Sequence, residues 1–518
     1  MRLRVPVLLS VLTVTSLGYI WLGLDAPRQI QVMTSIGVLG LSALAIFTWF
    51  VFISGAPRQI RLATVAGILI LLALSASLFR IRGVTGDLVP IVEYRFAPPR
   101  VLPEAERRPS EPGVPEAAPA TTPGVAAAQA VASPIGKPST EKQAPVAGAP
   151  TAEASAGHLP SRPGHGDWPQ YLGPTRSGVV PGIDLATDWT ARPPKLLWRQ
   201  PVGAGWAGFA VSGETAVTQE QRGSEERVIA YDLKSGRPLW SHADAAAHNS
   251  PLGGEGPRGV PAIDSGRVFA LGATGQLNAL DLKTGRLLWT RNVLKDNNAA
   301  EPEWGVAISP LIHGDLVIVG AGGVPDRALV AYKRQTGEPA WAAGSGRLAY
   351  SSPSLLTLAG REQVVMMKHT TASGHDPGTG AQLWEAEIGG EQPRAAPPLP
   401  LGENRVLFSI GYGVGSKVFE ISATQNGGQS ARLVWATPRL KSKFANLIAH
   451  EGSVYGLDDG VFVCLDPQTG ERRWKEGRYG HGQIIRAGRH LLVQTERGEI
   501  ILVEPNPERL IEVTGILV

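Results

Sequence analysis

The sequence contains very little cysteine and little charge of either sign. Its 518 residues include one cysteine, Cys464, and only 18% are charged, with a formal net charge of +4. A lone cysteine excludes an intramolecular disulfide, a cysteine-rich zinc site and the two-cysteine attachment of c-type haem. The chain also has no run dense in lysine or arginine, so nucleic acid is not an expected partner. By contrast, 62 glycines and 42 prolines indicate many turns, which favours β-structure.

Several catalytic motifs are also missing or lie in the wrong context. The sequence has neither H-E-x-x-H nor G-x-S-x-G. The glycine-rich stretch GYGVGS (411–416) lies between two expected strands, so we interpret it as a hairpin turn rather than a phosphate loop. Asp458 and Asp459 lie in another expected turn and are interpreted as hairpin residues rather than a catalytic acid pair. Cys464 alternates with Phe462 in an apolar strand and is expected to be buried.

Three long apolar runs occur near the N-terminus, at about 5–24, 32–54 and 62–79. Each approaches the length of about 20 residues that a helix needs to cross a membrane. The first run could instead be a signal peptide, but two further runs follow it and it lacks a small-residue cleavage site. We therefore predict a membrane domain over 1–96 with three transmembrane helices.

The arginines that flank these runs, and the segment that follows, indicate an orientation. With the N-terminus inside, a small excess of arginine falls on the cytoplasmic side: Arg2, Arg4, Arg58 and Arg61 inside, against Arg28, Arg80 and Arg82 outside. Residues 97–165 are rich in Pro and Ala and almost lack large apolar side chains, which predicts a disordered linker. We expect a multi-pass protein of the bacterial inner (cytoplasmic) membrane, with the rest of the chain in the periplasm.

One pattern recurs through the remaining two thirds of the chain. Clear copies, such as IAYDLKSGRPLW and NALDLKTGRLLW, end at Trp240, Trp289, Trp341, Trp384 and Trp474. A degenerate copy ends at Trp435, and KLLWRQPV around Trp198 keeps only the last strand. Each clear copy is a hairpin around a turn that ends in Gly, in most copies Asp-x-x-Thr-Gly, with two apolar runs before it. The unit is therefore a four-stranded antiparallel sheet. Radially repeated four-stranded units predict a β-propeller in which each Trp wedges between blades.

The A-x-D-x-x-T-G-x-x-x-W pattern resembles the tryptophan-docking motif of the quinoprotein propeller superfamily, named for pyrroloquinoline quinone (PQQ). This superfamily includes alcohol dehydrogenases and a propeller lipoprotein that scaffolds outer-membrane protein assembly. The stretch DWPQYLGPTRSGVVPG (167–182) resembles the opening of bacterial PQQ-like repeat proteins. The resemblance implies an all-β propeller over 166–518, with seven blades or with eight of which one is incomplete. We favour seven, with KLLWRQPV packed at the seam and completing the last blade.

In a propeller, the loops that enter the innermost strands meet at one mouth of the central channel. The residues at these places are Trp206, Arg258, Trp304, Ser352, Arg394, Lys443 and His481. Aromatic faces and cations around one axis would suit a small planar or anionic ligand. The alternative is that the tryptophans pack the channel and the cations form a solvated rim.

The resemblance raises the question of a PQQ cofactor with calcium. Dehydrogenases of the superfamily resemble one another in a calcium held by carboxylate and amide oxygens, a catalytic Asp and, often, two adjacent cysteines. Adjacent cysteines are impossible in this chain. Glu303 and Asn446 are weak candidates for metal ligands, and the sequence singles out no catalytic residue.

Two functions remain open at this point. The first is a non-catalytic scaffold, tethered to the membrane, that binds a ligand or an envelope protein. The second is a membrane-bound, PQQ-dependent alcohol dehydrogenase of the quinoprotein type. A sensor that signals through the helices is disfavoured, because a disordered tether transmits force poorly.

Overall fold

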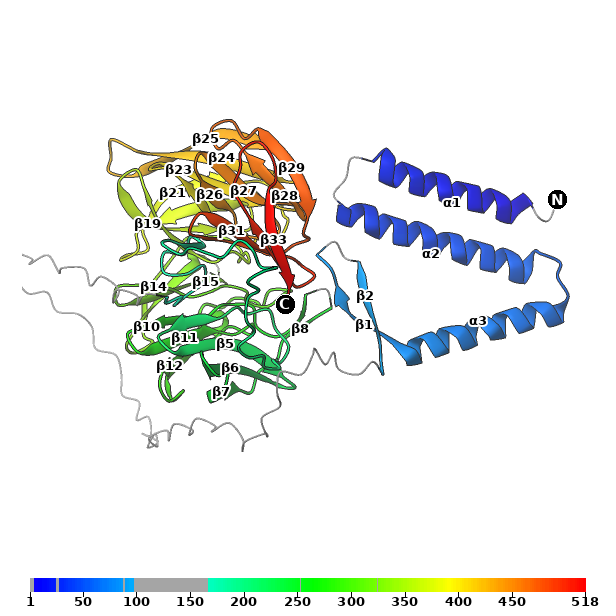
Figure 1. Cartoon of the computed structure of the whole chain (residues 1–518), viewed down its shortest axis with the longest axis horizontal. Coiled ribbons are helices and arrows are strands. Elements are labelled where there is room, and N and C mark those ends of the chain that lie inside the picture. Colours follow the sequence, from blue (N-terminus) through cyan, green and yellow to red (C-terminus); the bar gives the residue numbers. More distant parts are fainter. Residues whose placement is uncertain (1–3, 25–27, 87–88, 97–165, 252, 324) are drawn as a thin grey trace, which may run out of the picture.

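The computed structural model describes residues 4–24, 28–86, 89–96, 166–251, 253–323 and 325–518. The predicted linker, 97–165, lies outside the described residues. Figure 1 shows three long helices on one side of a large body of β-sheets, with a small hairpin between the two.

The three predicted apolar helices are present. They are α1 (Arg4–Leu22), α2 (Arg28–Phe52) and α3 (Arg58–Leu78), and each is long and apolar enough to cross a membrane. α2 and α3 begin at arginines that precede the apolar runs. Polar side chains join α1 to α2: the Trp21 indole donates to the Ser35 hydroxyl at 3.0 Å.

A β-hairpin follows α3 without a break, which the sequence analysis did not predict. Its strands are β1 (Phe79–Val84) and β2 (Pro90–Tyr94). They pair antiparallel, with Phe79 opposite Tyr94 and Ile81 opposite Val92. Apolar residues alternate over these positions, as is typical of a strand. The long apolar run that precedes them, 62–79, obscured this pattern.

The rest of the described chain forms seven consecutive sheets, six of four strands and one of five. This confirms the predicted all-β propeller of four-stranded blades. The first sheet contains β4 (Ala210–Ser212), β5 (Thr215–Arg222), β6 (Glu225–Asp232) and β7 (Pro238–Asp244). The second contains β10 (Ala262–Asp264), β11 (Arg267–Leu271), β12 (Gln276–Asp281) and β13 (Leu287–Asn292). The third contains β14 (Leu311–His313), β15 (Leu316–Gly323), β16 (Arg327–Lys333) and β17 (Pro339–Ala343).

The remaining four sheets repeat the same order. The fourth contains β18 (Ser354–Leu358), β19 (Arg361–Met367), β20 (Thr371–His375) and β21 (Gln382–Glu387). The fifth contains β22 (Leu399–Leu401), β23 (Arg405–Ile410), β24 (Gly415–Ala423) and β25 (Gln429–Thr437). The sixth contains β26 (Ile448–His450), β27 (Ser453–Asp458), β28 (Val461–Leu465) and β29 (Arg472–Arg478). The seventh contains β3 (Val179–Val180), β30 (Gln483–Ala487), β31 (His490–Gln494), β32 (Glu499–Val503) and β33 (Glu512–Leu517). Short elements between the first and third sheets are β8 (Asn249–Ser250), β9 (Gly254–Glu255) and α4 (Val293–Asp296).

The strand that joins the last sheet differs from the predicted one. It is β3, which pairs in parallel with β30, whereas KLLWRQPV (195–202) forms no strand. Instead, the Trp198 indole stacks on Tyr231 and donates to the carbonyl of Leu233 at 2.8 Å, both at the first sheet. The prediction that KLLWRQPV completes the last blade was therefore wrong. Trp198 packs on the first sheet because its indole lies against Gly236, the turn glycine of that sheet.

The repeated tryptophans contact the turn of the following sheet. The Trp240 indole donates to the Leu282 carbonyl at 2.8 Å, and that of Trp289 donates to the Arg334 carbonyl at 3.0 Å. A Cβ added to the turn glycine, Gly285 or Gly337, would lie within 2.7 Å of the indole above it. The glycine of each turn is therefore needed for close approach as well as for its positive φ. These contacts tie the first sheet to the second and the second sheet to the third.

A segment ahead of the first sheet crosses between distant sheets. The Pro169 carbonyl accepts from the Ile263 amide of the second sheet, and Arg176 donates to the Pro310 carbonyl beside the third, at 2.7 and 2.9 Å. The Val180 carbonyl accepts from the amide of Gly488 in the seventh, at 2.8 Å. The DWPQYLGPTRSGVVPG stretch therefore links sheets on opposite sides of the ring.

A buried carboxyl group spans the first two sheets. Glu226 in β6 is only 4% exposed, and its carboxylate accepts from the Ala273 amide at 3.0 Å. Burial raises the pKa of Glu226 to about 7, well above the ordinary value of 4.5. Protonation of this group therefore accompanies folding at mildly acidic pH.

We expect this burial to appear as a pH-dependent effect of Glu226→Gln. The raised pKa stabilises the fold fully below pH 4.5, and that contribution is lost as the pH rises towards 7. The neutral amide avoids this loss, so the variant should gain about 3 kcal/mol relative to the unsubstituted chain between pH 4.5 and 8. Denaturant unfolding of both proteins at the two pH values measures the difference. A difference that does not change with pH would contradict the assignment.

Candidate functional site

Loops that are far apart in the sequence meet at one mouth of the propeller. Trp304, before β14, stacks on Tyr350, before β18, with ring centroids 4.9 Å apart. Phe444, before β26, contacts Trp304 edge to face at 6.2 Å and also contacts His481, before β30, at 5.9 Å. The equivalent loops of the third, fourth, sixth and seventh sheets therefore converge, as predicted from their equivalent positions in the repeats.

Two of the predicted mouth cations are bound by the protein's own backbone. Arg258 donates to the carbonyls two, four and five residues before it, namely Gly256, Gly254 and Gly253. Arg394 makes the same three contacts, with Gln392, Gly390 and Gly389.

Burial lowers the pKa of both arginines, to about 10 for Arg394, which is only 1% exposed. Identical bonding at equivalent places identifies a repeated loop clamp. These guanidinium groups therefore organise the loops of the mouth, with three hydrogen bonds each to backbone carbonyls.

Two further predicted residues join neighbouring inner strands. The Ser352 hydroxyl accepts from the Ser309 amide at 2.9 Å. The Asn446 side chain makes two bonds to Ile484, donating to its carbonyl at 2.6 Å and accepting from its amide at 3.2 Å. Both side chains connect adjacent sheets below the mouth.

The two predicted tryptophans behave differently. Trp206 is 71% exposed, although its indole donates to the Gly253 carbonyl at 3.1 Å. Trp304 packs in the aromatic cluster, and its Nε1 is buried without a hydrogen-bond partner. Trp206 is therefore the aromatic face that the mouth presents to solvent.

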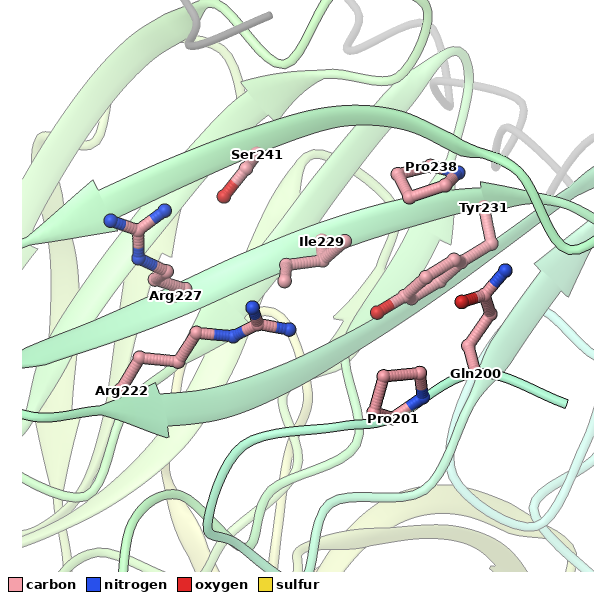
Figure 2. A pocket seen from close by; sticks show the side chains of 8 residues that line it. All are labelled: Gln200, Pro201, Arg222, Arg227, Ile229, Tyr231, Pro238 and Ser241. Atoms are coloured by element: carbon pink, nitrogen blue, oxygen red, sulfur yellow. The ribbon is translucent and has the colours of Figure 1, made fainter. Parts of the chain in front are cut away.

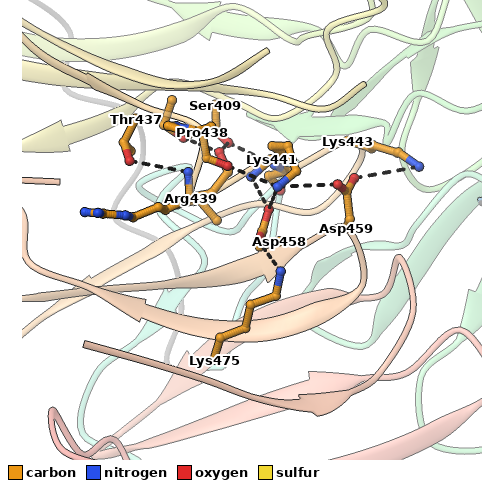
Figure 3. A network of polar contacts seen from close by, with 12 residues as sticks. Ser409, Thr437, Pro438, Arg439, Lys441, Lys443, Asp458, Asp459 and Lys475 are labelled. Carbon is orange, nitrogen blue, oxygen red and sulfur yellow. Dashed lines mark hydrogen bonds and ion pairs between the residues drawn. The ribbon is translucent and has the colours of Figure 1, made fainter. Parts of the chain in front are cut away.

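Lys443 lies at the end of a network of ion pairs (Figure 3). Its side chain is fully buried, with Nζ 3.9 Å from Asp459 Oδ1 and over the Tyr412 ring at 5.4 Å. Asp458 beside it is 1% exposed and pairs with Lys441 at 2.7 Å and with Lys475. Asp459 lies in the predicted turn and Asp458 is the last residue of β27 before it. The two aspartates also pair with three lysines, which was not predicted from the sequence. The Tyr412 hydroxyl is also buried, and this burial raises its pKa.

Four residues at the mouth were not predicted: Gly86, Tyr350, Phe444 and Glu496. Tyr350 and Phe444 lie within two positions of the predicted Ser352 and Lys443, so a wider window around each loop would have included them. Gly86 and Glu496 carried no such signal. Gly86 belongs to the hairpin after α3, and it reaches the mouth only through the tertiary fold.

A shallow cavity of about 200 Å³ lies away from the mouth, at the face of the first sheet (Figure 2). The chain at Gln200 and Pro201 forms one side, and Arg222, Tyr231 and Ser241 lie on the other. It marks the place where the extended segment 195–202 covers the sheet incompletely.

The mouth fits a calcium-bound PQQ poorly. Such a tricarboxylate requires cationic donors, but those of Arg258 and Arg394 are directed at loop carbonyls. Asn446, a weak candidate for a calcium ligand, already uses its oxygen for the Ile484 amide, and the other candidate, Glu303, is exposed. Among the described residues, no group of three or more His, Cys, Asp and Glu side chains could hold a metal ion.

The chain is similar to proteins of known families. A family profile described as outer membrane protein assembly factor BamB matches residues 179–304 and 224–476. The protein of that name from Bordetella pertussis is 26% identical over 320 residues, which cover 57% of this chain and 69% of that protein. Quinohemoprotein alcohol dehydrogenase ADH IIB from Pseudomonas putida is 34% identical over 143 residues, which cover 26% of this chain and 20% of that enzyme. The crystal structure of BamB from Moraxella catarrhalis superposes with a TM-score of 0.44 at 18% identity, covering 60% of this chain and 85% of that one.

Proposed function

This chain belongs to the family described as outer membrane protein assembly factor BamB, and from that membership we propose that it is a membrane-tethered scaffold of the bacterial envelope. In this proposal, the three helices hold the protein in the inner membrane as a multi-pass anchor. The propeller then lies in the periplasm and binds envelope proteins through its exposed loops, without catalysing a reaction.

The observation that carries the proposal is the bonding of the mouth arginines. A ligand site needs polar groups that are preorganised and available to the ligand. Arg258 and Arg394 instead hold the carbonyls of their own loops. Rigid loops around a ring are suited to presenting a surface to another protein.

The rival function is a PQQ-dependent alcohol dehydrogenase. The partial match to the Pseudomonas putida enzyme favours it, although that match covers 20% of the enzyme. It requires free cationic donors and a calcium site at the mouth, and the bonding of Arg394 and Asn446 opposes both.

The exposed apolar side chains indicate where a protein partner gains most from contact. Leu197 is 68% exposed and Trp206 is 71% exposed, and both lie on the extended segment that precedes the first sheet. Burial of these exposed apolar side chains against a partner would contribute to binding. We propose that this segment contributes to partner binding.

In-cell photo-crosslinking of the full chain tests the scaffold function. A photoreactive amino acid at Leu197 or Trp206 should yield discrete crosslinked species that contain envelope proteins, identified by mass spectrometry. The matched control is Arg432, whose side chain is 69% exposed on β25, far from this segment. The proposal fails if positions 197 and 206 give no more crosslinked protein than position 432.

A further inference from the structure

The hairpin that follows α3 places its turn in the mouth of the propeller. Figure 1 shows β1 and β2 between the helices and the sheets. Gly86 of this turn contacts three propeller residues from two different sheets, Lys443, His481 and Glu496. These contacts join positions more than 350 residues apart in the sequence, since the hydrogen bonds separate their partners by 357 and 410 residues.

Both backbone groups of the glycine have a partner of matching charge. The Gly86 amide donates to Glu496 Oε1 at 2.7 Å, and the Gly86 carbonyl accepts from Lys443 Nζ at 3.2 Å. Hydrogen bonds to charged groups are about twice as strong as neutral ones. The mouth therefore recognises the peptide backbone through an anion on one side and a cation on the other.

The contact also selects for glycine. A Cβ at position 86 would overlap the imidazole ring of His481. The backbone of Gly86 does not have a positive φ, so an alanine there would not be strained by its own conformation. The requirement for glycine therefore comes from the close approach of the His481 side chain.

The hairpin and the propeller each also have internal contacts next to the site. In the hairpin, the Val89 amide donates to the Thr85 hydroxyl at 3.1 Å and the Thr85 amide donates to the Val89 carbonyl at 2.9 Å. In the propeller, the Glu496 amide donates to the Tyr479 carbonyl at 2.9 Å, and Asp459 faces the buried ammonium of Lys443 at 3.9 Å. Internal contacts of this kind reduce the conformational entropy that is lost on binding.

We propose that the mouth of the propeller is a binding site for a glycine turn at the tip of a β-hairpin, and that its occupant is this chain's own hairpin, 79–94. Because β1 continues α3 directly, the bound turn holds the propeller with its mouth facing the membrane. A strand of six residues extends about 20 Å, so the mouth lies about that far from the end of α3. This inference does not rest on the scaffold function, and each can fail alone.

A cysteine pair in the full chain tests the proposal. An ideal Cβ at position 86 lies 3.1 Å from the Cβ of His481, and cysteines form a disulfide when these atoms are about 3.5–4.5 Å apart, so a small shift suffices. Gly86→Cys with His481→Cys would be made in a chain that carries a protease site within 97–165. After mild oxidation in membranes and cleavage, the two fragments should migrate as one band on a non-reducing gel. The natural Cys464 is fully buried and should not react.

The control pair is Gly86→Cys with Gln468→Cys, since Gln468 is exposed in an outer turn of the sixth sheet. The proposal is overturned if the first pair links no faster than this control. It is also overturned if the uncut protein links mainly as a dimer, because the occupant would then be a second copy's hairpin.

Retention on vesicles gives a second measurement without cysteines. After linker cleavage in proteoliposomes, the propeller should remain with the vesicles longer than a Gly86→Leu variant, whose side chain blocks the turn from docking. Gly378→Leu is the matched glycine control, because its position has only an ordinary contact with Asp376 at 3.6 Å. Equal rates of release for the unsubstituted chain and the Gly86→Leu variant, together with no disulfide, would rule the site out.

Discussion

Replacing Trp240 with alanine is expected to lower the free energy of unfolding of the propeller by about 3–5 kcal/mol. The side chain is 2% exposed, and its indole lies against the turn glycine of the second sheet, Gly285. The substitution removes a large buried ring and leaves a cavity between two sheets. It also removes the donor to the Leu282 carbonyl. Denaturant unfolding followed by far-ultraviolet circular dichroism measures the loss.

Trp206→Ala is the matched control for this prediction. Trp206 is 71% exposed and lies at the mouth rather than between sheets. Its loss should change the unfolding free energy by less than about 1 kcal/mol. Equal effects of the two substitutions would show that the repeated tryptophans do not hold the sheets together.

Arg394→Met is expected to destabilise the propeller by about 3 kcal/mol in the absence of any ligand. The guanidinium is 1% exposed and donates to the carbonyls of Gly389, Gly390 and Gln392. Methionine fills part of the space but leaves these carbonyls without a donor, and each unsatisfied buried group costs about 1–3 kcal/mol. The same unfolding measurement applies.

Arg432→Met serves as the control, because this arginine is 69% exposed and its pair with Glu420 is at the surface. Such pairs contribute about 0–1 kcal/mol. If Arg394→Met left the stability unchanged, the structural role assigned to Arg394 in its loop would be wrong. A ligand-binding role for this arginine would then be the better interpretation.

The sequence predicted the propeller well because its signal is repeated and local. Each turn around Gly285 or Gly337 needs a residue with positive φ, and each strand ends in an indole that needs a flat neighbour. These requirements recur in most units, so several weak signals support one another. The prediction for KLLWRQPV was wrong because a single copy has no neighbour in the sequence that fixes which sheet it joins.

The mouth was predictable only in part, since the sequence gives position along a loop but not what a side chain bonds to. Lys443 and His481 follow from their equivalent positions in the repeats, and the structure brings them together. The direction of Arg394 towards its own loop depends on the shape of that loop. The arrival of Gly86 at the mouth depends on a hairpin far outside the repeats, which no local pattern connects to Glu496.

A cofactor titration tests most directly the claim that the mouth donors are committed to the protein itself. The full chain in lipid nanodiscs would be titrated with PQQ and calcium, with binding measured by calorimetry and activity by dye-linked alcohol oxidation. The bonding of Arg258 and Arg394 predicts no saturable binding and no oxidation. Saturable binding that is lost in Arg258→Met would contradict the account, because it would show that the same guanidinium serves a ligand.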